Sequence, residues 1–380
     1  MSQNEIMGRV AFAAQYAHPT PNGRESWEEA IDRVASMHKK KYPQEEDRID
    51  WAFSLVKDKR VVPSQRSTQF GGDAILRNNM RMYNCTFSPV DRPRFFSEMF
   101  WLLLCGSGTG FSVRRTDISQ LPRVILRDAY LSRRSMEYFV KDSIEGWAEA
   151  LQALLDSYFF TDYFDHAYDY ELEFNFSKVR PKGSPISSGG IAPGPEPLKT
   201  CLEKIKKILH SRFGQRLRSI DVFDVCMELS AAVLSGGVRR SASICLFDND
   251  DNLMLNAKTG DWWKYAPSRA YANISATIPT DGSETKSMIN RAVKLNREWG
   301  EPGVFFSNSP DFGTNPCCEI GLYPYFVQSA LGTHQTNLPL TVTRNRKRLE
   351  MGGWMWRSGW AVCNLTEINM ERNLTEKQFY

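Results

Sequence analysis

The segment Asn315-Pro316-Cys317-Cys318-Glu319 places an amide, thiols and a carboxylate within a few residues of one another. Asn315, Cys317 and Glu319 alternate by two, and in an extended segment this spacing projects side chains to one face. Cys318 would then face away from the other three, and we expect it to pack. A thiol flanked by a hydrogen-bonding amide and a proton-transfer carboxylate indicates a reaction centre.

Two distant cysteines, Cys85 and Cys363, could serve this centre as a reducing pair. The eight cysteines of the 380-residue chain include no C-x-x-C, so neither a disulfide scaffold nor a zinc ribbon is expected. The remaining cysteines lie in apolar contexts, where we expect core packing. These are Cys105, Cys201, Cys226 and Cys245.

Composition excludes several classes of protein. Hydrophobic residues make up 42% and charged residues 24%, which is typical of a globular protein. A net charge of +4 is too small to indicate direct nucleic-acid or membrane binding. No apolar run of ~18 residues and no secretory signal occurs, so we expect a cytoplasmic protein. The five histidines are scattered, and no metal site is expected.

Hydrophobic periodicity predicts an α/β fold, in which helices alternate with short strands. Helices are predicted within 24–60 and at 96–105, 144–160, 198–210, 220–234 and 288–299; strands are predicted at 111–113, 172–179, 244–247, 274–278, 304–306 and 364–370. We expect three parts: a helical region (1–60), a larger region (61–309) and a final region (310–380). A helix that starts at Leu374, close to Tyr380, suggests a fragment or half of a split protein.

Two kinds of glycine-rich segment stand out. Gly106-Ser107-Gly108-Thr109-Gly110 could approach a phosphate or form a tight helix-to-strand turn, and it lacks a Walker lysine. The other segments are a Gly- and Pro-rich loop from Pro181 to Pro197 and a second loop at 236–241. In the second loop, Arg239 and Arg240 offer bidentate contacts to a phosphate or a base.

Taken together, the motifs resemble the catalytic subunit of a ribonucleotide reductase, most closely the adenosylcobalamin-dependent class. They occur in that family's order from about Pro63 to Met370. They are Val62 to Arg66, Tyr83-Asn84-Cys85, Cys105 to Val113, Ile118 to Arg123, Val179 to Gly183, Gly189 to Pro195, Gly236 to Ala242, Asn315 to Glu319 and Cys363-Asn364-Leu365.

The resemblance implies a ten-stranded α/β barrel of two five-stranded halves with a finger loop through the middle. It places Cys317 at the finger tip, with Cys85 and Cys363 on neighbouring strands. The chain would supply the first half-barrel, the finger and one further strand. A second polypeptide carrying the other half is therefore an expected partner.

The resemblance also implies a reaction, the radical reduction of ribonucleotides to 2′-deoxyribonucleotides for DNA synthesis. Cys317 would become a thiyl radical and take the substrate 3′-hydrogen, with adenosylcobalamin as the cofactor. Glu319 would accept the 3′-hydroxyl proton, and Asn315 would hold the sugar and Glu319. Cys85 and Cys363 would reduce the 2′ position and end as a disulfide, which a thioredoxin-like protein or a dithiol restores.

Further positions follow from the same resemblance. Ser64 and Asn84 match positions near the substrate ribose and phosphate. The loops 183–197 and 236–241 match those that sense an allosteric deoxynucleotide or ATP. The effector residues implied there are Gly183, Ser184, Gly189, Gly190, Gly237, Arg239 and Arg240.

Two alternatives stay open. The chain could be a class I large subunit that needs a separate radical-generating subunit, or a nucleotide-binding half that is inactive alone. The residue types at Tyr83-Asn84-Cys85 and at Gly236 to Ala242 favour the cobalamin class. The sequence of Ile118 to Arg123 resembles that of the triphosphate reductases. A diphosphate substrate stays open as the alternative.

Overall fold

The computed structural model describes residues 3–159, 169–185, 191–234, 242–280, 282, 285–329, 334–335 and 354–368. The chain divides into two compact units, which are described separately. One comprises Met1–Asn84 with Cys363–Tyr380, and the other comprises Cys85–Val362. The division at residues 60 and 309 expected from the sequence stays a prediction.

The first unit is mainly helical, as the periodicity of 24–60 predicts. Its longest helices are α1 (Gln3–Gln15), α2 (Trp27–Lys41) and α3 (Glu46–Lys57). A capping box between Ser26 and Glu29 starts α2, and the turn Pro43–Glu45 separates α2 from α3. The short helices α4 (Gln65–Phe70) and α5 (Asp73–Arg77) follow strand β3 (Val61–Pro63), which pairs with β17 (Thr366–Ile368).

A six-stranded sheet forms the centre of the second unit, in the order β10-β9-β8-β5-β4-β16. The strands are β4 (Cys85–Pro89), β5 (Gly108–Ser112), β8 (Ser243–Asp248), β9 (Ala272–Ile278), β10 (Gly303–Phe306) and β16 (Ala361–Cys363). The pairs from β4 through β5, β8 and β9 to β10 are all parallel. Parallel neighbours need crossover connections, which the helices supply.

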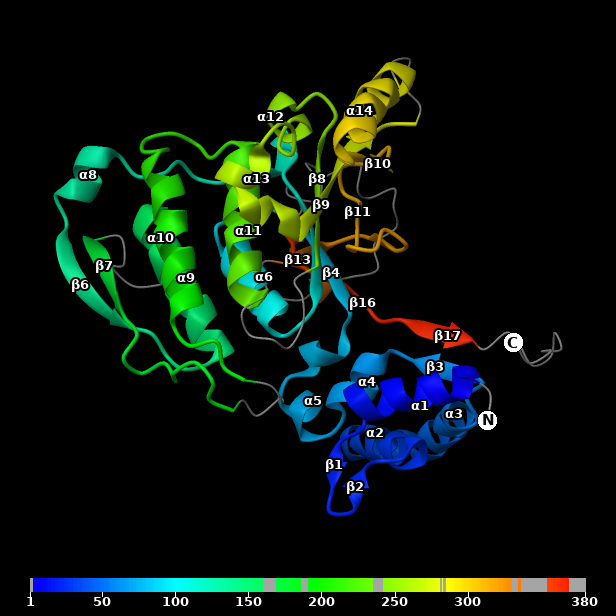
Figure 1. Cartoon of the computed structure of the whole chain (residues 1–380). Helices are drawn as coiled ribbons and strands as arrows, with labels where there is room; N and C mark the ends of the chain where they lie inside the picture. Colours follow the sequence, from blue (N-terminus) through cyan, green and yellow to red (C-terminus); the bar gives the residue numbers. More distant parts are fainter. Residues whose placement is uncertain are drawn as a thin grey trace. The chain divides into compact units, whose positions relative to one another are not determined.

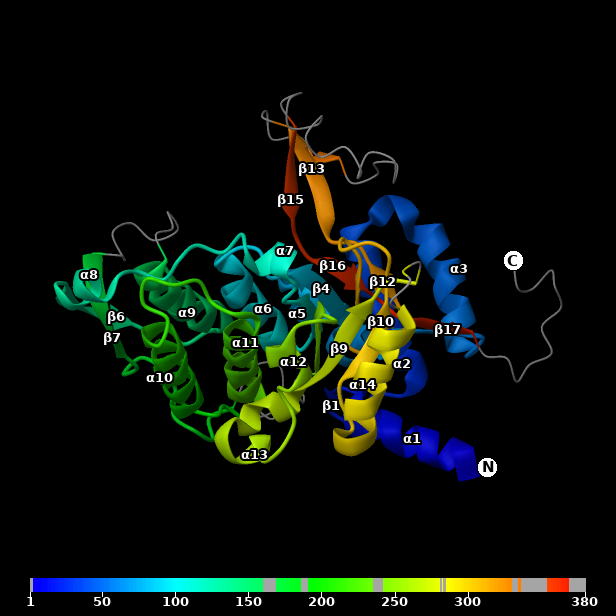
Figure 2. The same ribbon diagram turned by 90° about the horizontal axis from the view of Figure 1, so that it is seen from above.

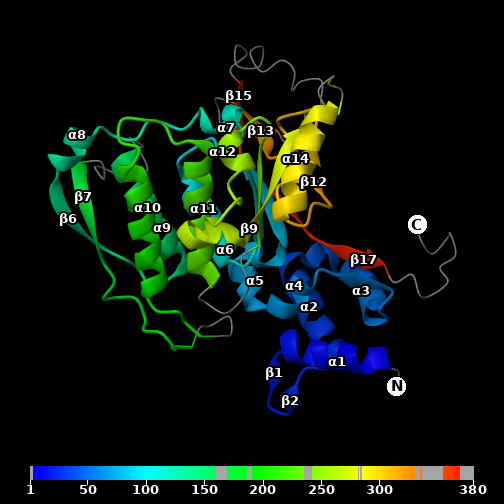
Figure 3. The ribbon, with the colours of Figure 1, turned by 45° about the horizontal axis from the view of Figure 1, so that its top comes forward.

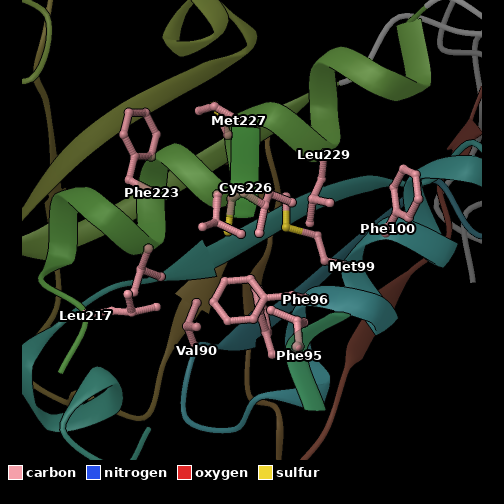
Figure 4. Packing of buried hydrophobic residues seen from close by; sticks show 14 of the residues in the cluster. Val90, Phe95, Phe96, Met99, Phe100, Leu217, Phe223, Cys226, Met227 and Leu229 are labelled. Carbon is pink, nitrogen blue, oxygen red and sulfur yellow. The ribbon is translucent and has the colours of Figure 1, made fainter. Parts of the chain in front are cut away.

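The helices of the second unit form layers over this sheet (Figure 1). The layer next to the sheet contains α6 (Arg94–Leu104) and α11 (Ser219–Leu234), and α9 (Ile144–Tyr158) and α10 (Glu196–His210) pack on it. Beyond α9 lies a parallel ribbon of β6 (Arg134–Phe139) and β7 (Tyr170–Asn175). Figure 4 shows Phe96 and Met99 of α6 beside Cys226 of α11 in the main core.

Two further elements flank the sheet. Helix α14 (Thr285–Trp299) packs on β9 and β10, on the side of these strands away from α11 (Figure 3). Strands β13 (Tyr325–Ser329) and β15 (Trp354–Ser358) form an antiparallel ribbon that projects from the rest of the unit (Figure 2). β14 (His334–Gln335) also pairs with β13. The pattern of the sequence did not predict this ribbon.

The α/β class is therefore confirmed, and the six predicted helical regions are present. The described residues contain a largely parallel six-stranded sheet, and both the half-barrel and the closure of a ten-stranded barrel stay predictions. Cys105, Cys201, Cys226 and Cys245 are at most 2% exposed, which confirms their assignment to the core.

Candidate active site

A tight hairpin carries the central motif. Strands β11 (Gly313–Thr314) and β12 (Gly321–Leu322) pair antiparallel, and the Cys318 N–H donates to the Asn315 carbonyl at 2.9 Å. Cys318 has φ +67°, which is uncommon for a residue with a Cβ. The prediction of an extended segment is wrong, because the backbone turns between Asn315 and Cys318. We call residues 313–322 the finger.

Asn315 and Glu319 nevertheless meet. Asn315 is fully buried, and its Nδ2 donates to Glu319 Oε1 at 2.8 Å. Its Oδ1 accepts from the Ile320 N–H at 3.1 Å, so the amide bridges both sides of the turn. Thr314 Oγ1 adds a bond to the Ile320 carbonyl at 3.1 Å. The turn therefore brings Asn315 and Glu319 together through hydrogen bonds, although the segment is not extended.

The two thiols at the tip are both exposed. The expectation that Cys318 packs is wrong, because the turn directs it to the surface, where its sulfur lies 4.0 Å from the Pro316 carbonyl oxygen. The pKa of the Cys318 thiol is raised. Partial burial of the sulfur is the largest cause, and the nearby Cys317 and Glu319 add to it. Glu319 is also exposed, so a thiol and a carboxylate are both presented outward.

Glycines of the G-x-G-x-G segment provide the surface on which the finger rests. Gly106 has φ +88° and forms the turn after α6, whereas Gly108 and Gly110 lie within β5. A Cβ on Gly110 would collide with the Thr314 carbonyl, and one on Gly108 would lie 3.1 Å from the Pro316 ring. A Cβ on Gly313 would overlap the Phe87 ring of β4. The segment thus forms a turn, as one of the two alternatives had it, and its later glycines permit close backbone approach.

Cys85 is the first residue of strand β4, which pairs with the strand whose glycines contact the finger. It is 4% exposed and pairs in register with Gly108, the residue whose Cα faces Pro316 of the finger. The second unit therefore brings the strand that begins at Cys85 next to the strand against which the finger packs.

A charged network fixes the chain that leads into β16. Arg92 is held by Asp91 at 2.9 Å and by Glu98 at 2.6 Å, and it donates to Ser358 Oγ at 2.7 Å. Trp360 donates to Glu98 at 2.9 Å and stacks on a phenylalanine of α6. Burial lowers the pKa of Arg92, but Glu98 and Asp91 more than offset it, so the pKa is raised overall. Residues 358–360 are thereby attached to the end of β4 and to α6.

The first unit brings together three other predicted residues. The Asn84 N–H donates to the Cys363 carbonyl at 3.1 Å, and Ser64 Oγ donates to Asn84 Oδ1 at 2.5 Å. Ser64 also caps α4, where it accepts from the Arg66 N–H. Both Ser64 and Cys363 are buried, at 4% and 5% exposure. These residues are far apart in the sequence, so only the fold brings them into contact.

The described part of the loop 183–197, which is predicted to bind an effector, folds back on itself. The Gly183 N–H donates to the Ala192 carbonyl, and the Ala192 N–H donates to the Ser184 carbonyl. Gly183 has φ +94°, which accounts for glycine there. Five predicted effector residues lie outside the described residues: Gly189, Gly190, Gly237, Arg239 and Arg240.

Sequence reasoning missed two structural arginines, Arg114, which is buried, and Arg92, which is partly exposed. Each follows shortly after a buried parallel strand, β4 or β5, and that position is the signal that could have revealed them. Asp117, in the turn after β5, accepts from Ser112 Oγ at 2.5 Å, and burial raises its pKa to about 7.

Among the described residues, no group of three or more His, Cys, Asp or Glu side chains is arranged to hold a metal ion. Within the same residues, no helix is long and apolar enough to cross a membrane.

Comparison with known proteins gives a consistent result. Residues 122–209 match the family described as "B12-dependent ribonucleotide reductase, insertion domain", which covers the β6–β7 ribbon, α9 and most of α10. A solved structure of a B-12 dependent (class II) ribonucleotide reductase matches 83% of this chain and 53% of its own, with a TM-score of 0.71 and 25% identity.

Curated relatives carry the same description. The adenosylcobalamin-dependent ribonucleoside-triphosphate reductases of Lactobacillus delbrueckii subsp. bulgaricus and Lactobacillus leichmannii are each 28% identical over 83% of this chain. A putative enzyme of that name from Mycobacterium phage D29 is 26% identical over 86%. The chain spans about half the length of these relatives, 52% to 55%. The resemblance inferred from the motifs is thus confirmed, and the cobalamin class is favoured over class I.

Proposed function

Because the chain resembles adenosylcobalamin-dependent ribonucleotide reductases in sequence, insertion domain and fold, we propose that it is the amino-terminal part of such an enzyme. The observation that carries this proposal is the finger. The Cys317 thiol is exposed on the same hairpin as the Glu319 carboxylate, and buried Asn315 holds that carboxylate through a hydrogen bond of 2.8 Å. The relatives' printed names supply the reaction class.

The three finger residues divide the work of the first half of the reaction. Cys317 donates its hydrogen atom, and the resulting thiyl radical takes the 3′-hydrogen of the ribose. Glu319 accepts the 3′-hydroxyl proton, for which a carboxylate within hydrogen-bonding reach is suited. Asn315 keeps one Glu319 oxygen fixed, so the other remains available to the substrate.

The relatives' name implies adenosylcobalamin, and the finger fits such a partner in one respect. Its thiol is exposed at a turn and not enclosed in the core, so a bound group can reach Cys317. When bound, adenosylcobalamin supplies the radical that withdraws a hydrogen atom from this thiol. The chain's own contribution is to hold Cys317, Asn315 and Glu319 in one hairpin.

The second half of the reaction requires two electrons and two protons. We propose that the Cys85 and Cys363 thiols supply them, so that the 2′-hydroxyl leaves as water and a disulfide remains. The hydrogen bond from Asn84, the residue before Cys85, to the Cys363 carbonyl at 3.1 Å supports this pairing. A thioredoxin-like protein or a dithiol then reduces the disulfide.

Substrate, effectors and partners belong to the same proposal. Ser64 and Asn84 would bind the substrate ribose and phosphate, and the relatives' name favours a ribonucleoside triphosphate. The loops at 183–197 and 236–241 would bind a deoxynucleotide or ATP effector. Because relatives are about twice as long, a second polypeptide or segment would complete the barrel. Reactive thiols suit a reducing cytoplasm.

The test is deoxynucleotide formation from ribonucleoside triphosphates with a dithiol, with and without adenosylcobalamin. The chain is assembled with the polypeptide that completes it. We expect turnover only when cobalamin is present, and little turnover from the 380-residue chain alone. Turnover that needs a separate radical-generating subunit would support the class I alternative. Nucleotide binding without any turnover in the assembled enzyme would support the alternative of an inactive half.

A further inference from the structure

Arg114 is a buried cation that contacts the base of the finger. It is 3% exposed, and its guanidinium donates to the Pro310 carbonyl at 2.5 Å and to the Phe312 carbonyl at 3.2 Å. Two further bonds of 3.2 Å go to Thr277 Oγ1 near the end of β9. One side chain therefore joins β5, β9 and the segment that enters the finger.

The scaffold that carries Arg114 is itself well fixed. The preceding residue, Val113, donates its N–H to the Leu246 carbonyl of β8 at 2.9 Å. The following residue, Arg115, donates its N–H to Asp248 at 2.8 Å and forms a bidentate pair with Asp250. Because both neighbours are bonded to the next strand or to the loop after it, the guanidinium is held by the sheet and not by a mobile loop.

The segment that Arg114 grips lacks a regular structure of its own. It connects the end of β10 at Phe306 with the start of β11 at Gly313, and its internal bonds are short-range, such as Asp311 N–H to Ser309 Oγ at 3.2 Å. Pro310 and Phe312 flank Asp311, so two carbonyls on either side of one residue are fixed at once. The planar guanidinium is suited to this because it presents several donors in fixed directions.

If the residue only filled space in the core, an apolar side chain would cost less free energy to bury. Burial disfavours the charged form and lowers the pKa of Arg114, despite Asp117 and Asp248 nearby. Its hydrogen bonds go to uncharged oxygens, which compensate a buried charge less well than a carboxylate does. The guanidinium instead provides hydrogen-bond donors in fixed directions, and these donors set where the finger begins.

The finger runs from this anchor toward its reactive tip. Along β11, Gly313 lies on Phe87, Thr314 lies on Gly110, and Pro316 lies on Gly108. The chain therefore passes from the carboxyl end of β5 to its amino end, where Cys317 follows Pro316. An anchor at the first end fixes how far the tip extends at the other, and misplacement of reacting atoms by about 1 Å costs on the order of 100-fold in rate.

We propose that Arg114 is a positioning residue that fixes the axial position of the finger, and hence of Cys317, by clamping the Pro310 and Phe312 carbonyls to the sheet. The role of Cys317 in this statement rests on the proposed function. The clamp itself rests on the hydrogen bonds alone.

The direct test is hydrogen–deuterium exchange of the 380-residue chain, read in peptides that cover residues 309–322. Arg114→Met removes the donors and keeps most of the apolar stem, and we expect exchange there to rise about 10-fold or more. Arg114→Lys retains one contact and should give an intermediate rise. Thr277→Val removes only the hydroxyl beside the guanidinium and should give the smallest rise.

Arg269→Met is the matched control. Arg269 is also a largely buried arginine, with a bidentate pair to Asp224 and a bond to the Ala257 carbonyl at 2.7 Å, but it does not contact the finger. Its loss should raise exchange around residues 257–272 and leave 309–322 unchanged. Unchanged exchange at 309–322 in Arg114→Met, or an equal rise in Arg269→Met, would overturn the proposal.

A second readout uses the assembled enzyme. Arg114→Met should bind substrate with the Kd of the wild type but lose about 10-fold or more of 3′-tritium exchange, with partial rescue in Arg114→Lys. A loss confined to substrate Kd would contradict a positioning role. If the wild type shows no 3′-exchange, the proposed function fails while the hydrogen exchange still decides the clamp. If Arg114→Met does not fold, Arg114→Lys and Thr277→Val carry the test.

Discussion

The thiols at the finger tip and the two thiols proposed to form the reducing pair are held in two opposite ways. Cys317 and Cys318 stand exposed on a turn, with a hydrogen-bonded amide and carboxylate beside them. Cys85 and Cys363 are at most 5% exposed and lie at the ends of strands. A thiol that must meet a bound cofactor and substrate needs access, whereas a pair that must form one bond needs fixed geometry.

The supports differ in the same way. The finger is positioned by glycines that allow close contact with a neighbouring backbone or ring, and by one buried arginine at its base. The segment before Cys363 is held by side chains, namely Arg92 with its carboxylates and the Trp360 stack. A close contact at a glycine leaves no room for added atoms, whereas a side-chain network tolerates conservative replacement, so the two regions should respond differently to mutation.

The largest expected contrast is in thiol reactivity. Brief alkylation of the native chain with iodoacetamide, followed by mass spectrometry, should label Cys317 and Cys318 at least ~100-fold faster than Cys85 or Cys363, because buried thiols react only after opening of the structure. The raised pKa of Cys318 lowers its thiolate fraction, so it should react more slowly than an unperturbed thiol. Equal labelling of Cys85 and Cys317 would break the comparison.

Adding one methyl group to a finger glycine tests how closely the finger packs against the sheet. Gly313→Ala would drive a Cβ into the Phe87 ring, so we expect a loss of about 1–3 kcal/mol in the free energy of unfolding, measured with urea. Gly321→Ala, on the paired strand, meets nothing within 4 Å and should change stability by less than about 0.5 kcal/mol. Equal effects of the two substitutions would contradict close packing of the finger at Gly313.

The side-chain network should be more tolerant. Trp360→Phe retains an aromatic ring over α6 but loses the hydrogen bond to Glu98, and we expect a loss of about 1 kcal/mol. Trp360→Ala also loses the stacked ring and should cost about 3–5 kcal/mol. Thermal unfolding of the two variants measures the difference. A cost for Phe as large as that for Ala would show that the network is as intolerant as the finger.

A further prediction concerns pH. Burial raises the pKa of Asp117 from 3.8 to about 7, so the folded state binds the extra proton and loses stability as pH rises between these values. Asp117→Asn should match the wild type below about pH 4 and gain relative stability up to about pH 7. Asp250→Asn is the control of opposite sign, because Arg115 lowers the pKa of Asp250. Urea unfolding at pH 5 and pH 8 would decide, and parallel curves for wild type and Asp117→Asn would refute the assignment.

Much of the fold could be predicted, because it depends on local pattern. The helical periodicity of 144–160 and 198–210 corresponds to α9 and α10, and short apolar runs correspond to β8 and β9. The motifs also singled out three residues that lie together in the first unit, although their roles stay predictions. Ser64, Asn84 and Cys363 are joined by hydrogen bonds that periodicity alone does not predict.

The rest depended on geometry that spacing does not encode. The alternation of Asn315, Cys317 and Glu319 predicted an extended segment, but a positive φ at Cys318 closes a turn. Arg114 could not be assigned from the sequence, because its partner Pro310 is 196 residues away. The glycines of β5 had two interpretations until the finger was seen to lie on them.

One measurement tests the central claim most directly, the release of 3′-tritium from labelled nucleotide by the assembled enzyme. Cys317→Ser should abolish release while nucleotide binding is retained, because a serine O–H bond is much harder to break homolytically than a cysteine S–H bond. Cys318→Ser, at the neighbouring exposed thiol, should retain most of the release. Release that survives in Cys317→Ser and is lost in Cys318→Ser would contradict the account.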